Sequence, residues 1–143
     1  MASIIQGATV GLKYLVLTGA INFNADTFKM ALYTDDADLS PSMTPSTYST
    51  TNEVVGAGYT AGGKTLVTVG PSFDSPTVTS YVNFGTTSWA SATFSARGAT
   101  IYQSVSLEII AVLDFGSIKT VNNETLTIEF PDNTTTGALI RFT

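Results

Sequence analysis

The pattern that most constrains this chain is an alternation of apolar and polar residues with a period of two. In residues 125–130, Leu126, Ile128 and Phe130 alternate with polar residues. Successive side chains of a β-strand point to opposite faces, so this alternation predicts a strand with one buried face. The same pattern predicts half-buried strands at 27–34, 64–69, 80–84, 92–97, 99–102 and 138–142.

Residues 107–115 form the most apolar stretch of the chain. Alternate residues from Leu107 to Phe115 are all apolar, and Ile110 and Val112 make the middle of the other face apolar as well. This predicts a central strand that is buried on both sides at its middle. Seven or eight strands separated by Gly, Pro, Asn and Asp turns predict an all-β fold, either a β-sandwich or a jelly roll.

The N-terminal segment, residues 1–24, has a different period. Apolar residues recur at helical spacing from Val10 to Ile21, and Thr9 can act as an N-cap. We therefore expect a short helix over residues 9–17, closed by the Thr-Gly pair at 18–19. Gly11 and the β-branched residues are poor helix formers, so a strand is the alternative.

A length of 143 residues fits one domain over 1–143.

Residues 34–63 have no sustained period. Loops longer than about 12 to 15 residues are uncommon in compact domains unless they function or are disordered. One interpretation is a flexible loop, and the other is an ordered arm that lies on a neighbouring subunit. The arm is favoured because the segment carries apolar and aromatic side chains that a solvated linker would rarely carry. These candidate protein-interface residues are Met43, Tyr48, Val54, Val55 and Tyr59.

The residue types needed for catalysis are scarce. The chain contains no histidine and no cysteine. This removes the commonest general base, the Ser-His-Asp arrangement, the usual zinc ligands and disulfide bonds. No serine lies in a recognisable nucleophile motif, and no glycine-rich phosphate loop opens a helix. We therefore expect no enzyme activity, no catalytic residues, no metal site, no cofactor and no small-molecule substrate.

Two weaker interpretations remain open at this stage. The acidic residues Asp35, Asp36 and Asp38 could bind calcium, which takes about six to eight oxygen ligands, but the EF-hand glycine and glutamate are missing and a solvated turn is favoured. Trp89, with the tyrosines, could stack on sugars, although an aromatic residue on an amphipathic strand more often belongs to a core or an interface.

The charge of the chain limits its partners. Only 12% of the residues are charged, against about 25% in typical domains. A formal net charge of −5 argues against a nucleic-acid partner. The N-terminal residues lack the features of a secretory signal, and no apolar run approaches the ~18 residues that span a membrane. We expect a protein made and used in the cytosol, or in a particle assembled there, with no membrane partner.

Several blocks in this order resemble a family of small virion structural proteins of tailed bacteriophages. The resemblance covers about residues 12–142 and rests on 26–34 (DTFKMALYT), 48–54 (YSTTNEV), 58–66 (GYTAGGKTL), Trp89, 93–99 (TFSARGA), Ile101-Tyr102 and 113–116 (LDFG). It implies an auxiliary capsid protein, meaning a cement or decoration subunit with a jelly-roll-like fold on the capsid exterior. The family has no catalytic residues to carry over.

The implied partners are the major capsid protein and copies of the chain itself, as a dimer or trimer. A tail, neck or fibre-associated virion subunit is the alternative within virion proteins. A carbohydrate-binding adhesion module is the alternative from another class.

Overall fold

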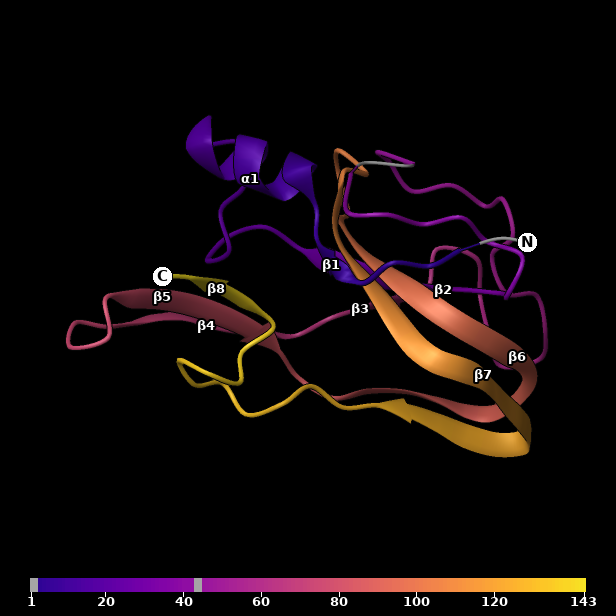
Figure 1. Ribbon diagram of the computed structural model, residues 1–143. Coiled ribbons are helices and arrows are strands. Elements are labelled where there is room, and N and C mark those ends of the chain that lie inside the picture. Colours follow the sequence, from indigo (N-terminus) through magenta and orange to yellow (C-terminus); the bar gives the residue numbers. More distant parts are fainter. Residues whose placement is uncertain (1–2, 43–44) are drawn as a thin grey trace.

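The computed structural model describes residues 3–42 and 45–143, and most of its regular structure is antiparallel strand (Figure 1). A five-stranded sheet has the order β1-β7-β6-β2-β3, and a three-stranded sheet has the order β4-β5-β8. The prediction of an all-β single domain is confirmed. In chain order the elements are β1 (Gly7–Ala8), α1 (Val10–Leu17), β2 (Phe28–Tyr33), β3 (Lys64–Thr65), β4 (Thr68–Asp74), β5 (Thr79–Phe84), β6 (Thr87–Gln103), β7 (Ile109–Ile128) and β8 (Ile140–Phe142).

The long hairpin of β6 and β7 is the largest unit of the five-stranded sheet. Its register runs from Thr87 opposite Ile128 to Tyr102 opposite Ile109. The sequence pattern predicted four separate strands here, at 92–97, 99–102, 107–115 and 125–130, and that prediction is wrong. The register shifts four times along the hairpin, and each bulge breaks the period of two without ending the strand. Figure 1 shows both strands curving back at one end of the hairpin.

The predicted strand at 64–69 is also wrong as a single element. The chain leaves the five-stranded sheet after Thr65 and enters the three-stranded sheet at Thr68. Leu66 lies between the two, where its side chain is buried and its N–H donates to the Phe28 carbonyl at 2.8 Å. The other predicted strands appear as β2, β5 and the shorter β8.

The five-stranded sheet is covered by apolar side chains on both faces. Phe28, Met30 and Leu32 of β2 belong to the larger cluster, which also includes residues of α1, β5 and β8. Ala31 and Tyr33 point to the other face and belong to a second cluster. The prediction that 27–34 is a half-buried strand is therefore wrong. The second cluster comprises Ile4, Ala31, Tyr33, Ala37, Leu39, Tyr102, Ile109 and Val112, with Tyr48 packed against it.

Helix α1 lies where the sequence placed a helix. The Thr9 side chain accepts a hydrogen bond from the Leu12 N–H at 3.0 Å, so it is the N-cap. The same hydroxyl donates to the Ile109 carbonyl at 2.7 Å, which ties the start of the helix to β7. Thr18 is the C-cap, and Gly19 follows with a φ of 74°. The prediction of a helix over 9–17 with a Thr-Gly end is confirmed.

The segment 34–63 contains no helix and no named strand among its described residues, and its strand-like pairing with the sheet is limited to isolated bridges such as that of Glu53 with Tyr33. Near its end it crosses β2 closely. A Cβ atom at Gly63 would lie 1.7 Å from the Met30 carbonyl oxygen, and Gly63 has a φ of 77°. Only glycine fits this crossing.

Ile110 provides a test of the core. Its side chain is fully buried in the larger cluster, so we expect Ile110→Ala to lower the free energy of unfolding by about 2 to 5 kcal/mol through lost burial and a residual cavity. Urea melts of the two proteins measure the change.

Val105→Ala is the matched control, because Val105 is 89% exposed and its substitution should stay within about 0.5 kcal/mol. Equal losses for the two variants would contradict the placement of Ile110 in the core.

Candidate protein interface

Helix α1 is apolar around most of its circumference. Its sequence is VGLKYLVL, and Lys13 is the single charged residue. Leu12 is buried against the body, whereas Tyr14 is 66% exposed and Leu17 is 85% exposed. Val10, Tyr14 and Leu17 are spaced at i, i+4 and i+7, so they line one face of the helix. We call these three residues the outer face of α1. One side of the helix therefore packs on the body and another presents apolar side chains to solvent.

A groove lies beside this helix. It has a volume of about 410 Å³ and is lined by Val10, Gly11, Tyr14, Leu15 and Glu108. Glu108 is the one charged residue of the lining. Four of the five lining residues belong to α1, so the groove and the exposed helix side chains form one apolar surface. Exposed apolar surfaces of this kind mark sites of interaction with other proteins.

Residues 45–63, part of the segment 34–63 that sequence reasoning assigned to an arm, are fastened to the chain's own sheet. Val54 is 3% exposed and belongs to the larger core cluster. The ring of Tyr48 stacks on that of Tyr102, with centroids 4.7 Å apart. The ring of Tyr59 lies edge-on to that of Phe94, with centroids 5.8 Å apart.

A buried carboxylate holds this segment together. Glu53 accepts hydrogen bonds from the Tyr48 hydroxyl at 2.7 Å, from the Tyr59 hydroxyl at 2.6 Å and from the Gly62 N–H at 2.8 Å. The Tyr59 hydroxyl also accepts from the Leu32 N–H of β2 at 2.9 Å. We call Glu53, Tyr48, Tyr59 and Gly62 the Glu53 cluster. Buried charges are stabilised by such partners, and here the donors come from three points of one loop.

The structure corrects the free-arm interpretation for three of the five candidate residues. Tyr48, Val54 and Tyr59 contact the body of the chain itself and are not free anchors of an arm. Val55 is 93% exposed and stays a candidate contact for a partner. Met43 lies outside the described residues. Sequence reasoning missed Glu53, although a glutamate within an apolar and aromatic segment was the available signal.

The tyrosines around Glu53 resist ionisation. Burial raises the pKa of Tyr33 to about 12. Burial also raises the pKa of Tyr48 and of Tyr59 above the usual value, and the hydrogen bond to Glu53 raises both further. Tyr33, Tyr48 and Tyr59 are therefore neutral phenols that donate hydrogen bonds.

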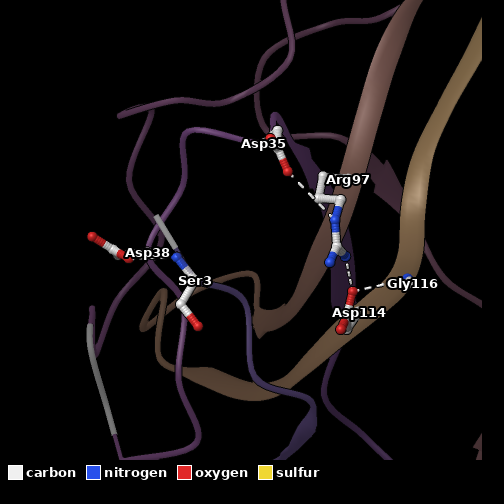
Figure 2. A network of polar contacts seen from close by, with 6 residues as sticks. All are labelled: Ser3, Asp35, Asp38, Arg97, Asp114 and Gly116. Atoms are coloured by element: carbon white, nitrogen blue, oxygen red, sulfur yellow. Dashed lines mark hydrogen bonds and ion pairs between the residues drawn. The ribbon is translucent and has the colours of Figure 1, made fainter. Parts of the chain in front are cut away.

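The acidic residues considered for calcium point to different partners (Figure 2). Asp35 Oδ1 lies 3.4 Å from Arg97 Nε, and Arg97 also pairs with Asp114 of β7. Asp38 Oδ1 instead accepts a hydrogen bond from the Ser3 N–H at 2.7 Å. Within residues 3–42 and 45–143, no three acidic side chains gather as a metal site. These contacts fasten the start of the long loop to the sheet.

Trp89 does not form a sugar-binding platform. Its side chain is 1% exposed and belongs to the larger core cluster. The core interpretation of this residue is confirmed.

A cavity of about 590 Å³ lies between β7 and the C-terminal segment. Its charged lining residues are Asp114, Glu129 and Arg141. Asp114 is already paired with Arg97, and Arg141 donates to the Thr136 carbonyl at 2.8 Å. Asp114 and Arg141 therefore serve contacts within the chain.

Comparisons with protein-family models, curated proteins and solved structures find no match to this chain. No helix in the described part of the chain has the length and apolar character required to cross a membrane.

We expect Glu53→Gln to destabilise the protein by about 1 to 3 kcal/mol, because one amide oxygen cannot satisfy three buried donors. Amide hydrogen exchange in residues 45–63 should accelerate more than exchange in β6 and β7. Thermal melts and exchange mass spectrometry provide the two measurements.

Glu124→Gln is the control for this substitution, since Glu124 is exposed on β7. Unchanged exchange in residues 45–63 of Glu53→Gln would show that the cluster does not hold the loop.

Alkaline pH should destabilise the fold through the tyrosines. An unfolded tyrosine loses its proton near pH 10, whereas Tyr33 in the folded chain keeps its proton to about pH 12. Between these values the unfolded state binds fewer protons, so stability falls as pH rises, by at most about 1.4 kcal/mol per pH unit for each such group. Urea melts from pH 8 to pH 12 should show this decline, with a shallower slope for Tyr33→Phe. An identical slope in the variant would exclude Tyr33 as a contributor.

Proposed function

We propose that this chain is a non-enzymatic structural subunit of a bacteriophage virion. In this role it is a capsid cement or decoration protein that binds the major capsid protein on the outside of the shell. The observation that carries the binding role is the uncovered outer face of α1, where Tyr14 is 66% and Leu17 is 85% exposed beside an apolar groove. Such a face gains free energy when a partner covers it, at about 25 cal/mol per Å² of apolar surface.

The virion assignment is supported by the resemblance of the sequence blocks to phage structural proteins. In the structure these blocks form the scaffold: 26–34 contains β2, 48–54 contains Glu53, and 93–99 lies in β6. These blocks account for a body that the chain would share with such phage proteins. Binding to the capsid of a particular phage would use other surfaces. The outer face of α1 lies largely outside these blocks, as expected for a surface adapted to a particular partner.

The rigidity of the body also fits this role. A cement subunit must hold its binding surfaces at fixed positions relative to each other, because a preorganised surface loses less conformational entropy on binding. The long β6–β7 hairpin and the Glu53 cluster both provide such rigidity. Few charges and many Ser and Thr residues suit a surface that neighbouring subunits cover in part.

The test is binding of the purified protein to capsid shells that lack it, measured by co-sedimentation. Tyr14→Ser with Leu17→Ser should weaken binding at least about tenfold, because each apolar anchor can contribute on the order of 2 kcal/mol. The thermal midpoint should change little, since both side chains are exposed.

Val105→Ser is the matched control, with an exposed valine in the β6–β7 turn. Wild-type binding by the double variant would exclude α1 as the docking element. A copy number that matches a single tail or neck ring, and not the capsid lattice, would contradict the cement role.

A further inference from the structure

The three-stranded sheet carries an uncovered apolar row at its outer end. Phe73 of β4 is opposite Ser80 of β5, and Ser80 is opposite Phe142 of β8. Directly opposed residues in antiparallel strands share a face, so Phe73, Ser80 and Phe142 form one row across the sheet. We call these residues the Phe73 row. Phe73 is 77% exposed and Phe142 is 42% exposed.

This row is a continuation of the core face. Ser80 and Val82 are two residues apart on β5, so their side chains lie on the same side of the sheet. Val82 is opposite Ile140, and both are buried in the larger core cluster. The face that the body covers at Val82 and Ile140 therefore extends beyond the body and is left open at the Phe73 row. Figure 1 shows this sheet projecting away from the long hairpin.

The end of the projecting sheet is held in shape by its own turn. Asp74 Oδ2 accepts hydrogen bonds from the N–H of Thr77 at 3.0 Å and from its hydroxyl at 2.7 Å. These bonds hold the pKa of Asp74 below its usual value. Val78, which is 78% exposed, follows in the same turn. A turn ordered before binding reduces the entropy lost when a partner covers it.

The charged neighbours of the row lie on the opposite face of the sheet. Asp74 is opposite Thr79, and Arg141 is opposite Tyr81, one position along each strand from the row. The row itself carries no charge. Two copies that each have a net charge of −5 can therefore meet at this face without placing like charges against each other.

We propose that the Phe73 row is a self-association surface, on which a second copy of this chain packs its own Phe73 row. The surface has the character of a core cut in half, as in the interfaces of homodimers. Phe73, Val78 and Phe142 expose roughly 400 Å² of apolar side chain, given about 150 to 250 Å² for an aromatic residue. A standard interface buries about 800 Å² per partner, of which somewhat more than half is apolar. The turn residues 75–77 and Ser80 would supply the polar remainder.

The fold restricts how the two copies can meet. The body covers the face beyond Val82, so only the projecting ends can overlap, with the two bodies pointing away from each other. A two-fold axis that runs along the row satisfies this condition and places each Phe73 opposite the partner's Phe73. Stacked sheets lie about 10 Å apart, which two facing phenylalanine side chains can fill.

Self-association through the Phe73 row does not depend on the proposed binding to a capsid. Sedimentation equilibrium of the free protein should show a monomer and a dimer in a concentration-dependent ratio. Phe73→Ser should raise the dissociation constant at least about tenfold. Leu17→Ser, on α1, should leave the dimer unchanged.

The absence of native cysteines allows a second measurement of geometry. Ser80→Cys leaves both phenylalanines of the row in place, and it should be joined to its symmetry mate by a bismaleimide that spans about 10 Å, the spacing of stacked sheets. Val105→Cys, at an exposed position in the turn between β6 and β7, should not be cross-linked under the same treatment.

A wild-type protein that stays monomeric up to millimolar concentration would overturn the inference. So would a Phe73→Ser variant that dimerises as well as the wild type, or equal cross-linking at positions 80 and 105. Loss of dimer in Leu17→Ser alone would assign self-association to α1 instead. Loss of capsid binding in the α1 variant with an intact dimer would leave the two surfaces independent, as inferred here.

Discussion

The burial of a single carboxylate underlies the architecture of this protein. The five-stranded sheet has two apolar faces, and the irregular segment 45–63 packs on both: Tyr48 packs against the second cluster, whereas Val54 and Tyr59 pack with the larger one. Regular secondary structure does not hold that segment in place. Glu53 accepts hydrogen bonds from the two tyrosine hydroxyls and from the Gly62 N–H. The Tyr59 hydroxyl in turn accepts a hydrogen bond from the backbone of β2. Without these bonds, the segment would leave polar backbone groups unsatisfied and Tyr33 and Tyr102 exposed.

The structure separates residues that make the body from residues that can meet a partner. Tyr48 and Val54, which sequence reasoning assigned to a partner, are used internally. The side chains proposed to contact partners lie on α1 and on the projecting three-stranded sheet. In these elements the backbone groups hydrogen-bond to each other, so the side chains are not needed as their partners. Binding surfaces built on a helix and a sheet hold their geometry better than a free arm would. An apolar residue in a long loop is thus weak support for an interface unless the loop is known to lack contacts of its own.

The sequence predicted those helices and strands that residue patterns within the element itself determine. The helix followed from Thr9 and the apolar spacing after it, and β5 followed from alternation in 80–84. The length of β6 and β7 could not be predicted, because each bulge changes the sheet face to which the following residues point. In the sequence, this break in the alternation looks like the end of a strand. The roles of Glu53 and Tyr59 depend on which sheet face the loop covers, and that is a property of the tertiary structure. The Phe73 row was also hidden, since Phe73, Ser80 and Phe142 become neighbours only through strand pairing.

The order of strands in the five-stranded sheet has a consequence for how the chain must fold as it is synthesised. Strand β2 pairs with β3 and β6, and the greater part of its partner surface is in β6, which is made much later. Until then the apolar stretch FKMALY has no sheet to join. The strands β6 and β7 are adjacent in sequence, so their hairpin can close first. The N-terminal half of the chain can then pair with this hairpin. The nascent chain consequently passes through a stage in which the apolar strand β2 is complete but unpaired.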